Sequence, residues 1–504
     1  MSTTVDPVDA IEKLPTGIPG FDHISQGGLP LGRTALVAGT SGSAKTVFAC
    51  QFLAAGILQY DEACVFITFE ETPKEIRKNM LGFGWDIEKW EAEKRWTFVD
   101  ASPEIGDEQI VMADYDFGGL LARIEFAIEK TGARRVAFDS IGAIFAQFAD
   151  TAIVRRELLR IVSVLRELKT TAVLTAERTA EYGPVARYDV EEFVSDNVII
   201  LRNVLEGEKR RRTLEILKFR GTVHNKGEFP FTVMPGSGLE AIPLSAIELE
   251  QGSTNTRITS GNEDLDSICG GGFFRDSVIL VSGATGTGKT LMVSEFAGAC
   301  DKGEKCLIFA FEESREQLTR NADGWGLDFP EFERRGRLRL SCFYPESATL
   351  EDHLIRIRRE IEAFQPDRVA IDSLSALERV SSVKAYREFV ISITAHVKQQ
   401  NIAMLVTATT PSLLGGSSVT EAHISSITDS IILLRYVELL GEMRRGLTVI
   451  KMRGSRHDKD IREYTIDSTG MSLGEPFRNV TGIISGMPQG ISVEEQGRLN
   501  QLFE

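Results

Sequence analysis

The sequence at residues 283–290 is Gly283-Ala284-Thr285-Gly286-Thr287-Gly288-Lys289-Thr290. It matches the phosphate-loop pattern G-x-x-x-x-G-K-[ST] at every position and follows the β-rich apolar run Ser277–Gly283. Glycines let successive backbone N–H groups turn toward one anion, and the start of the following helix adds positive potential. We therefore expect this loop to bind ATP, with Lys289 on the β- and γ-phosphates and the Thr290 hydroxyl on Mg²⁺.

The first half of the chain has a related loop, Gly39-Thr40-Ser41-Gly42-Ser43-Ala44-Lys45-Thr46. Ala44 stands where the pattern has its second glycine, and its Cβ can crowd the phosphate or resist the backbone angles that glycine adopts. Lys45 and Thr46 are intact, so we expect this loop to bind ATP and Mg²⁺ as well. The alternative is a degenerate first site with only a structural role.

Further segments recur in the same order in both halves of the chain. The span from Asp139 to Arg220 is 81 positions, and the span from Asp372 to Arg453 is also 81. Ordered matches with equal spacing indicate a tandem duplication at domain scale. We place the two domains at residues 1–245 and 246–504, because a polar stretch interrupts the pattern near residues 252–256.

Each half alternates short β-rich runs with amphipathic segments. In the first half, Val136–Phe138 and Thr171–Thr175 are typical of strands, whereas apolar residues between Leu158 and Leu168 recur at helical spacing. Such alternation predicts an α/β fold with a mainly parallel sheet flanked by helices in each domain. We expect nearly all of these apolar residues to pack in the core.

Composition narrows the possible functions. The 504 residues carry a net charge of −16, which argues against a protein that acts on nucleic acid or binds anionic membranes. The six cysteines form no Cys-x-x-Cys pair, so neither a zinc site nor a redox dithiol is indicated. No run approaches the length of a membrane span and no signal peptide is evident. We therefore expect a cytoplasmic protein.

Acidic residues follow apolar runs at equivalent places in both halves. Asp139 and Asp372 are the expected carboxylates on the Mg²⁺ side, although an aspartate at a strand end can also cap a turn. The pairs Glu70-Glu71 and Glu312-Glu313 also come directly after strands. Adjacent carboxylates in a cleft raise one another's pKa, so one member can accept a proton. The alternative is a solvated acidic loop.

Cations recur late in each half, at Lys218 and Arg220 and at Lys451 and Arg453. A cation supplied by a neighbouring subunit can neutralise charge on a transferred phosphoryl group, as an arginine finger does. That role requires a ring with the nucleotide at each subunit interface. The alternative is a set of surface ion pairs.

Together these motifs resemble the KaiC family of circadian-clock ATPases, which are RecA-like. The resemblance covers nearly the whole chain and includes Glu191–Asn197, Lys451–Asp458 and Ile484–Gly486. It implies two tandem RecA-like P-loop ATPase domains that stack as the two rings of a homohexamer. The first ring would be a slow ATPase and the second an autokinase and autophosphatase that uses ATP and Mg²⁺.

The family's phosphorylated pair corresponds to Ser425 and Ser426, and Thr420 matches a nearby hydroxyl. When Asp196 is aligned with Asp429, Glu192 and Phe193 occupy the places of the two serines. The first half therefore has no acceptor hydroxyl there, and only the second half can be an autokinase at this site. Without the resemblance, a Ser-Ser pair could simply cap a helix.

The resemblance also implies partners. A KaiB-like protein would dock on the first ring, where Glu104–Gly118 is acidic. The segment from Gly486 to Glu504 resembles the family's activator-binding tail but stops soon after Leu502-Phe503, which leaves open whether a KaiA-like activator binds. Two other functions stay open: a RecA-like motor acting on DNA, and a nucleotide-gated scaffold without kinase activity.

Overall fold

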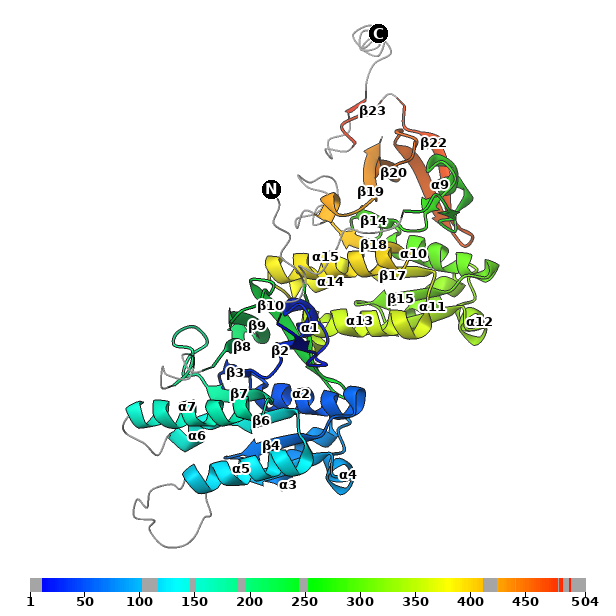
Figure 1. The fold of residues 1–504 in the computed structure, drawn as a ribbon. Helices are drawn as coiled ribbons and strands as arrows, with labels where there is room; N and C mark the ends of the chain where they lie inside the picture. The colour runs from blue at the N-terminus through cyan, green and yellow to red at the C-terminus, as the bar shows by residue number, and fades with distance from the viewer. Residues whose placement is uncertain are drawn as a thin grey trace, which may run out of the picture. The chain divides into compact units, whose positions relative to one another are not determined.

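The computed structural model describes residues 11–101, 117–145, 151–187, 192, 195–243, 253–410, 424–439, 441–478, 480–483 and 489–490. Its internal contacts divide the chain into two units, Met1–Ala246 and Ile247–Glu504. Each unit contains a nine-stranded sheet with helices on its faces (Figure 1). The predicted α/β fold class, with two tandem domains of mainly parallel sheet flanked by helices, is confirmed.

The sheet of the first unit has the order β11-β10-β9-β8-β3-β7-β6-β4-β5. The strands from β8 to β5 run parallel, and β9, β10 and β11 extend the β8 edge as antiparallel strands. Their bounds are β3 (Thr34–Gly39), β4 (Cys64–Thr68), β5 (Trp96–Asp100), β6 (Arg135–Asp139), β7 (Thr171–Glu177), β8 (Asn197–Glu206), β9 (Lys209–Phe219), β10 (Glu228–Met234) and β11 (Gly238–Ala241). A short ribbon of β1 (Lys13–Leu14) and β2 (Leu29–Pro30) precedes them.

Helices cover both faces of this sheet because successive strand residues point to opposite sides. Ala35 and Val37 belong to the core under α1 to α4, whereas Leu36 and Ala38 belong to the core under α5 to α7. The helices are α1 (Phe21–Ile24), α2 (Lys45–Tyr60), α3 (Pro73–Leu81), α4 (Ile87–Ala92), α5 (Phe117–Thr131), α6 (Ile141–Phe145) and α7 (Thr151–Glu167).

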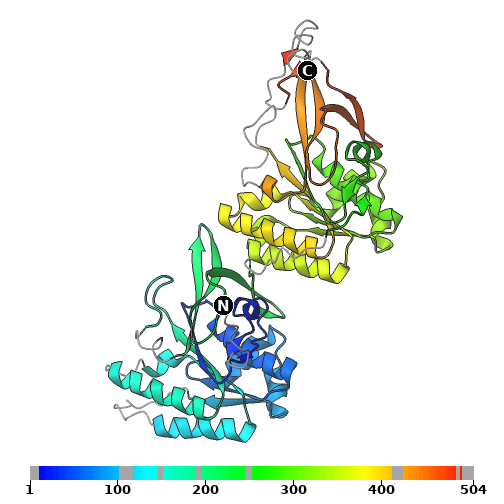
Figure 2. The same cartoon turned by 45° about the horizontal axis from the view of Figure 1, so that its top comes forward.

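The second unit repeats this plan, with the order β16-β15-β17-β18-β14-β19-β20-β21-β22. Here β20, β21 and β22 are the antiparallel strands, and Figure 2 shows this part of the unit in orange and red, extending past the helices. The strands are β14 (Val278–Gly283), β15 (Cys306–Ala310), β16 (Leu338–Cys342), β17 (Arg368–Asp372), β18 (Ala403–Thr409), β19 (Ser430–Leu439), β20 (Glu442–Met452), β21 (Arg462–Asp467) and β22 (Gly470–Pro476).

The helices and short ribbons of the second unit complete the described elements. The α-helices are α9 (Glu263–Ile268), α10 (Lys289–Gly298), α11 (Arg315–Asp323), α12 (Phe329–Arg334), α13 (Leu350–Phe364), α14 (Leu374–Arg379) and α15 (Val383–Gln399). The 3-10 turns are η3 (Ala299–Lys302), η4 (Pro345–Ser347) and η5 (Ile424–Ser426). The ribbons pair β12 (Arg257–Ile258) with β13 (Phe273–Phe274) and β23 (Val480–Thr481) with β24 (Gln489–Gly490). None of the helices in the described part of the chain is long and apolar enough to cross a bilayer.

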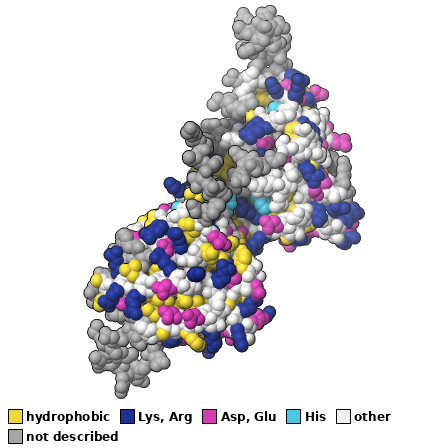
Figure 3. Space-filling model, viewed as in Figure 1, with side chains coloured by type: hydrophobic (Ala, Val, Ile, Leu, Met, Phe, Trp, Pro, Cys, Tyr) yellow, Lys and Arg dark blue, Asp and Glu magenta, His cyan; other side chains and the backbone are white. Residues whose placement is uncertain are grey.

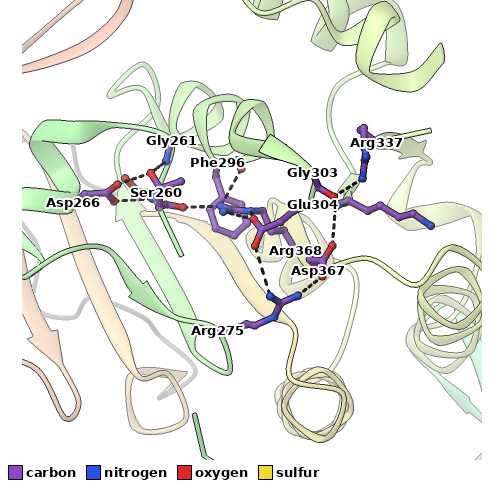
Figure 4. A network of polar contacts seen from close by, with 12 residues as sticks. Ser260, Gly261, Asp266, Arg275, Phe296, Gly303, Glu304, Arg337, Asp367 and Arg368 are labelled. Atoms are coloured by element: carbon purple, nitrogen blue, oxygen red, sulfur yellow. Dashed lines mark hydrogen bonds and ion pairs between the residues drawn. The ribbon is translucent and has the colours of Figure 1, made fainter. Parts of the chain in front are cut away.

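A buried arginine begins the equivalent strand in each unit. In the second unit, Arg368 donates from Nε to Glu304 at 2.6 Å and from Nη1 to the carbonyl of Thr259 at 2.6 Å (Figure 4). In the first unit, Arg135 donates from Nε to Glu62 at 2.7 Å. Each buried charge is therefore paired, and it ties the start of a central strand to the segments packed around it.

One apolar residue of the helical repeat in α7 lies outside the core. Leu158 is buried at 2% exposure, but its neighbour Leu159 is 51% exposed. Both fit a helical repeat, yet only one side of α7 packs against the sheet.

Candidate functional site

The phosphate loop of the second unit connects β14 to α10. Gly288, the residue before α10, has φ 95° and ψ 21°, which is the left-handed region. Lys289 begins the helix, and its Nζ donates to the carbonyls of Gly283 at 3.0 Å and Ala284 at 2.9 Å. Burial lowers the pKa of this lysine, while Asp372 and Glu312 oppose that shift. The lysine therefore lies against the loop that it would share with a bound phosphate.

The first loop keeps the same backbone shape despite its alanine. Ala44 has φ 72° and ψ 29°, and Lys45 Nζ donates to the carbonyls of Gly39 and Thr40 at 3.0 Å each. A left-handed conformation costs a residue with a Cβ roughly 1–2 kcal/mol. The first loop thus has the geometry of the second, held at some cost in conformational strain.

The strand residue equivalent to Ile466 is smaller in the first unit, where the loop residue is larger. In the second unit, a Cβ on Gly288 would lie 2.7 Å from Ile466 Cδ1. The corresponding residue in the first unit is Val233, because Val233 pairs with Leu239 as Ile466 pairs with Met471. Valine is one methylene shorter than isoleucine. Ala44 and Val233 pack against the same core cluster, so a smaller neighbour accompanies the larger loop residue.

Strand-end aspartates lie beside threonine hydroxyls in both units. Asp372 accepts from Thr290 Oγ1 at 2.8 Å and from Thr407 Oγ1 at 2.5 Å, and burial raises its pKa. Asp139 accepts from Thr175 Oγ1. A carboxylate next to the hydroxyl of the phosphate loop is an oxygen donor set that suits Mg²⁺ bound together with a nucleotide. The residues of the second unit therefore fit this ion.

The glutamate pair of the second unit has two different environments. Glu312 is 43% exposed, accepts from Ser373 Oγ at 3.0 Å and is ion-paired with Arg379. Glu313 is less exposed and accepts from Asn321 Nδ2 at 3.1 Å. Burial, with Asp372 as the second cause, raises the pKa of Glu313. The first carboxylate is exposed, and the second is partly buried.

The first unit repeats most of this arrangement. Glu70 accepts from Ser140 Oγ at 2.9 Å, and Glu71 accepts from Asn79 Nδ2 at 3.2 Å. Burial, with Asp139 as the second cause, raises the pKa of Glu71. The two glutamate pairs therefore have equivalent serine and asparagine partners. They differ in that the first unit has an alanine in its sequence where the second unit has Arg379.

Sequence reasoning missed the residues that hold these glutamates. Ser140 and Ser373 follow the two aspartates directly, and Asn79 and Asn321 each stand eight positions after their glutamate. Comparing the two halves at these positions would have found all four. Arg379 has no counterpart in the first half, so the duplication gave no signal for it.

The late cations of the second unit lie beside the serine pair. Lys451 Nζ donates to the carbonyl of Thr428 at 2.6 Å, and Arg453 Nη2 donates to the carbonyl of Ser426 at 2.8 Å. Burial, with Arg453 as the second cause, lowers the pKa of Lys451. Ser425 and Ser426 form part of η5, just before β19. The cations therefore contact the segment that carries the serines.

The corresponding cations of the first unit behave in the same way. Lys218 Nζ donates to the carbonyls of Glu192 and Ser195 at 2.8 Å each. Arg220 Nη1 lies 3.7 Å from Asp196 Oδ1. Burial, with Arg220 as the second cause, lowers the pKa of Lys218.

The serines and cations lie near the amino ends of the parallel strands, whereas the phosphate loop of the same unit lies at the carboxyl ends. Ser430 pairs with Ile279 near the start of β14, whereas Gly283, where the loop begins, pairs with Leu434. Four residues of strand span about 13 Å. The phosphate loop, Asp372 and the glutamate pair follow the carboxyl ends of the parallel strands, and η5 precedes the amino end of β19. Within one unit, the two predicted halves of the site do not meet.

Some predicted residues lie outside the described part of the chain. These are the side chain of Ser425, Thr420, residues 104–116 of the acidic segment, and all of the tail from Gly486 except residues 489–490.

Comparisons with known proteins identify relatives along the whole chain. The family model described as "ATPase: KaiC" matches residues 14–246 and 258–477. The circadian clock protein KaiC3 of Synechocystis sp. is 64% identical over 497 residues, covering 98% of each chain. Circadian clock oscillator proteins KaiC of Thermosynechococcus vestitus and Synechococcus elongatus are 55% and 54% identical, covering 98% of this chain and 95% of their own.

Proposed function

Because this chain belongs to the KaiC ATPase family, we propose that it is a homohexameric timing protein of a circadian clock, with two chemically distinct rings. The first unit hydrolyses ATP slowly. The second unit transfers the γ-phosphoryl group of ATP to Ser425 and Ser426 of a neighbouring copy and later removes it. The printed names of the relatives, which are circadian clock proteins, support the timing role.

The observation that carries this proposal is that Ser426 and the phosphate loop lie at opposite ends of the parallel strands of one sheet. Ser426 precedes the amino end of β19, and the strand from Ser430 to Leu434, which lies beside the loop, alone spans about 13 Å. Direct transfer needs reacting atoms about 3–3.5 Å apart. In a ring of identical copies, the segment of one copy that carries the serines faces the phosphate loop of the next copy. That arrangement brings the acceptor, Lys451 and Arg453 to a neighbour's ATP.

Each residue then has a defined task. Glu312 takes the proton from the serine hydroxyl of the adjoining copy. The serine oxygen forms a bond to the γ-phosphorus while the bond from phosphorus to the bridging oxygen breaks, and ADP leaves. Lys451 and Arg453 stabilise the charge that spreads over the phosphoryl oxygens. Mg²⁺, when bound, neutralises the phosphates, and Thr290 and Asp372 are the residues that would hold it.

Glu312 is the better candidate for the base than Glu313. A hydroxyl that arrives from another copy must reach an exposed carboxylate, and Glu312 is 43% exposed. Glu313 is bound to Asn321 inside its own unit and so serves to position the site. By the same reasoning Glu70 orients the attacking water in the first unit, with Glu71 in the supporting role and Lys218 and Arg220 supplied by the neighbour.

Partners follow from the family. We propose that a KaiB-like protein docks on the first ring through residues 104–118, and that any KaiA-like activator would use the tail beyond Gly486. A motor acting on DNA is disfavoured by the net charge of −16. On the face seen in Figure 3, basic and acidic side chains are interspersed over both units.

Transfer between copies can be tested by complementation with γ-labelled ATP. Lys289→Ala removes nucleotide use in the second unit but keeps the serines. The double variant Ser425→Ala/Ser426→Ala keeps nucleotide use but has no acceptor. We expect neither variant to be labelled alone, and we expect a mixture of the two to label the Lys289→Ala chains. Size-tagging one chain identifies which carries the label.

The outcomes separate the candidate functions. Label on the Lys289→Ala variant alone would show that the second-unit loop is not the phosphoryl source. No label on the wild-type protein, with ATP hydrolysis intact, would leave a plain ATPase. No label and no hydrolysis would leave a nucleotide-gated scaffold. The Lys45→Ala variant is the matched control: we expect it to lose slow hydrolysis or hexamer assembly while its second-unit loop stays intact.

A further inference from the structure

Arg435 on β19 is a buried cation that has no partner among the described residues. It is 5% exposed, and its Nε and Nη1 atoms are buried without a hydrogen bond. Burial lowers its pKa, and no charged group contributes to that shift. Arginine stays protonated in proteins, so burial alone does not remove its charge. An isolated buried charge is unfavourable unless an anion compensates it.

The duplicated fold supplies a reference for this residue. Arg202 on β8 has the equivalent place, because Arg202 pairs with Thr213 as Arg435 pairs with Gly446. The guanidinium of Arg202 donates from Nη2 to Glu215 at 2.6 Å, and its Nη1 lies 3.7 Å from Glu228. In the first unit the same buried arginine is therefore neutralised by carboxylates on the neighbouring antiparallel strands.

The second unit has the arginine but not these carboxylates. The strand register places Thr448 where the first unit has Glu215, and the sequence places Ile461 where it has Glu228. Gly446, directly opposite Arg435, has no side chain, whereas the first unit has a threonine there. Among the described residues of the second unit, the guanidinium of Arg435 therefore lacks the carboxylates that neutralise its counterpart in the first unit.

We propose that Arg435 is an anion-binding residue of the second unit, which binds an oxyanion group, phosphate or carboxylate, supplied from outside the described residues. The guanidinium plane suits such groups because its N–H donors match two oxygens at once. The residues that flank Arg435 in β19 lie beside the phosphate loop, whereas the Arg435 side chain points to the other face of the sheet. Leu434 pairs with Gly283, and the Tyr436 hydroxyl lies 2.7 Å from where a Cβ on Gly286 would be.

The test compares thermal unfolding of the full-length protein in phosphate and in chloride at equal ionic strength. A saturating non-hydrolysable ATP analogue with Mg²⁺ keeps both phosphate loops occupied in every sample. Arg435→Met keeps the apolar stem and removes the charge, and Arg435→Lys keeps the charge without the planar fork. Arg202→Met is the matched control, because it removes an arginine that already has carboxylate partners.

If free phosphate is the source of the anion, phosphate raises the melting midpoint of the wild-type protein by about 2–4 °C. Arg435→Met shows no such rise, and Arg202→Met keeps it although its midpoint in chloride is lower. If a carboxylate of the assembled protein is the source, phosphate has no effect and Arg435→Met lowers the midpoint more than Arg435→Lys does. The proposal is overturned if phosphate has no effect and Arg435→Met melts at or above the wild-type midpoint.

Discussion

The guanidinium of Arg379 at the end of α14 is ion-paired with the carboxylate of Glu312, the residue that we propose as the base of phosphoryl transfer. The same carboxylate also accepts from Ser373 Oγ at 3.0 Å. Two donors on one carboxylate fix its orientation before an acceptor hydroxyl arrives. The first half of the chain has Ala146 at the position of Arg379, and an alanine cannot form this ion pair.

Removing this contact should slow autophosphorylation without abolishing it. Exposed ion pairs contribute about 0–1 kcal/mol, so we expect Arg379→Ala to reduce the initial labelling rate about two- to five-fold. Arg379→Lys should recover part of the loss because it keeps the charge. ATP hydrolysis by the first unit, measured in a Lys289→Ala background with and without Arg379→Ala, should be unchanged. A labelling rate equal to that of the wild-type protein would mean that Ser373 alone orients Glu312.

The two glutamates of the second unit should differ in importance. Glu312→Gln keeps the shape but cannot accept a proton, and we expect it to reduce labelling about 10²–10⁴-fold. Glu313→Gln keeps a group that can bond to Asn321, so we expect a much smaller loss. The measurement is single-turnover labelling with saturating γ-labelled ATP. The reverse ranking of the two variants would assign the base to Glu313 instead.

Local sequence was sufficient to predict the strand–loop–helix connections at Gly39–Thr46 and Gly283–Thr290 and the parallel strands. Gly288 and Lys289 carry their conformational and chemical requirements in the residue types themselves, so no distant contact is needed to recognise them. The equal spacing of Asp139–Arg220 and Asp372–Arg453 added the duplication. These features depend on near neighbours or on repetition, both of which a single sequence displays.

Contacts between residues far apart in the chain could not be predicted from local sequence. The antiparallel register of β20 with β19 puts Lys451 near the amino end of β19, at the opposite end of the strands from its own phosphate loop. Nothing near Lys451 in the sequence specifies β19 as its partner strand. Leu159 fits the helical repeat, but only packing against the sheet decides which side of α7 is buried. The ion pair of Arg379 with Glu312 joins residues 67 positions apart in the chain, and the first half offered no parallel for it.

A further prediction concerns the sizes of the side chains at positions 288 and 466, which lie next to each other in the second unit. Gly288→Ala would place a methyl group 2.7 Å from Ile466 Cδ1, and such overpacking costs about 1–3 kcal/mol. Ile466→Val reproduces the first unit, which has Val233 at the equivalent strand position and Ala44 in the loop. We therefore expect Gly288→Ala/Ile466→Val to be more stable than Gly288→Ala alone, as measured by denaturant unfolding. Strictly additive effects of the two substitutions would show that the methyl group and Ile466 do not compete for space.

The final prediction concerns a buried carboxyl group behind the second phosphate loop. Glu295 on α10 accepts from the backbone N–H of Met471 at 2.8 Å, and burial raises its pKa to about 7. The first unit has the neutral Gln51 at this position, with Nε2 donating to the carbonyl of Leu239 at 3.0 Å. At this position the second unit therefore has a carboxyl group whose pKa is raised to about 7, where the first unit has a neutral amide.

The direction of the pH effect follows from linkage. The unfolded carboxyl has a pKa near 4.5, so between about pH 4.5 and 7 the folded protein binds more protons than the unfolded chain. The stabilisation from the protonated carboxyl of Glu295 is complete below about pH 4.5 and is lost as pH rises toward 7. A shift from 4.5 to about 7 corresponds to a loss of stability on the order of 3 kcal/mol at pH 8 relative to pH values below 4.5.

Glu295→Gln should remove this part of the pH dependence. The amide can accept from Met471 N and donate to its carbonyl, as Gln51 does for Leu239. We expect the variant and the wild-type protein to have similar unfolding free energies near pH 5, and the variant to be more stable at pH 8. Gln51→Glu is the matched control, and it should create the same loss of stability with rising pH in the first unit. Parallel pH profiles for Glu295→Gln and wild type would mean that Glu295 ionises in the folded protein with an ordinary pKa.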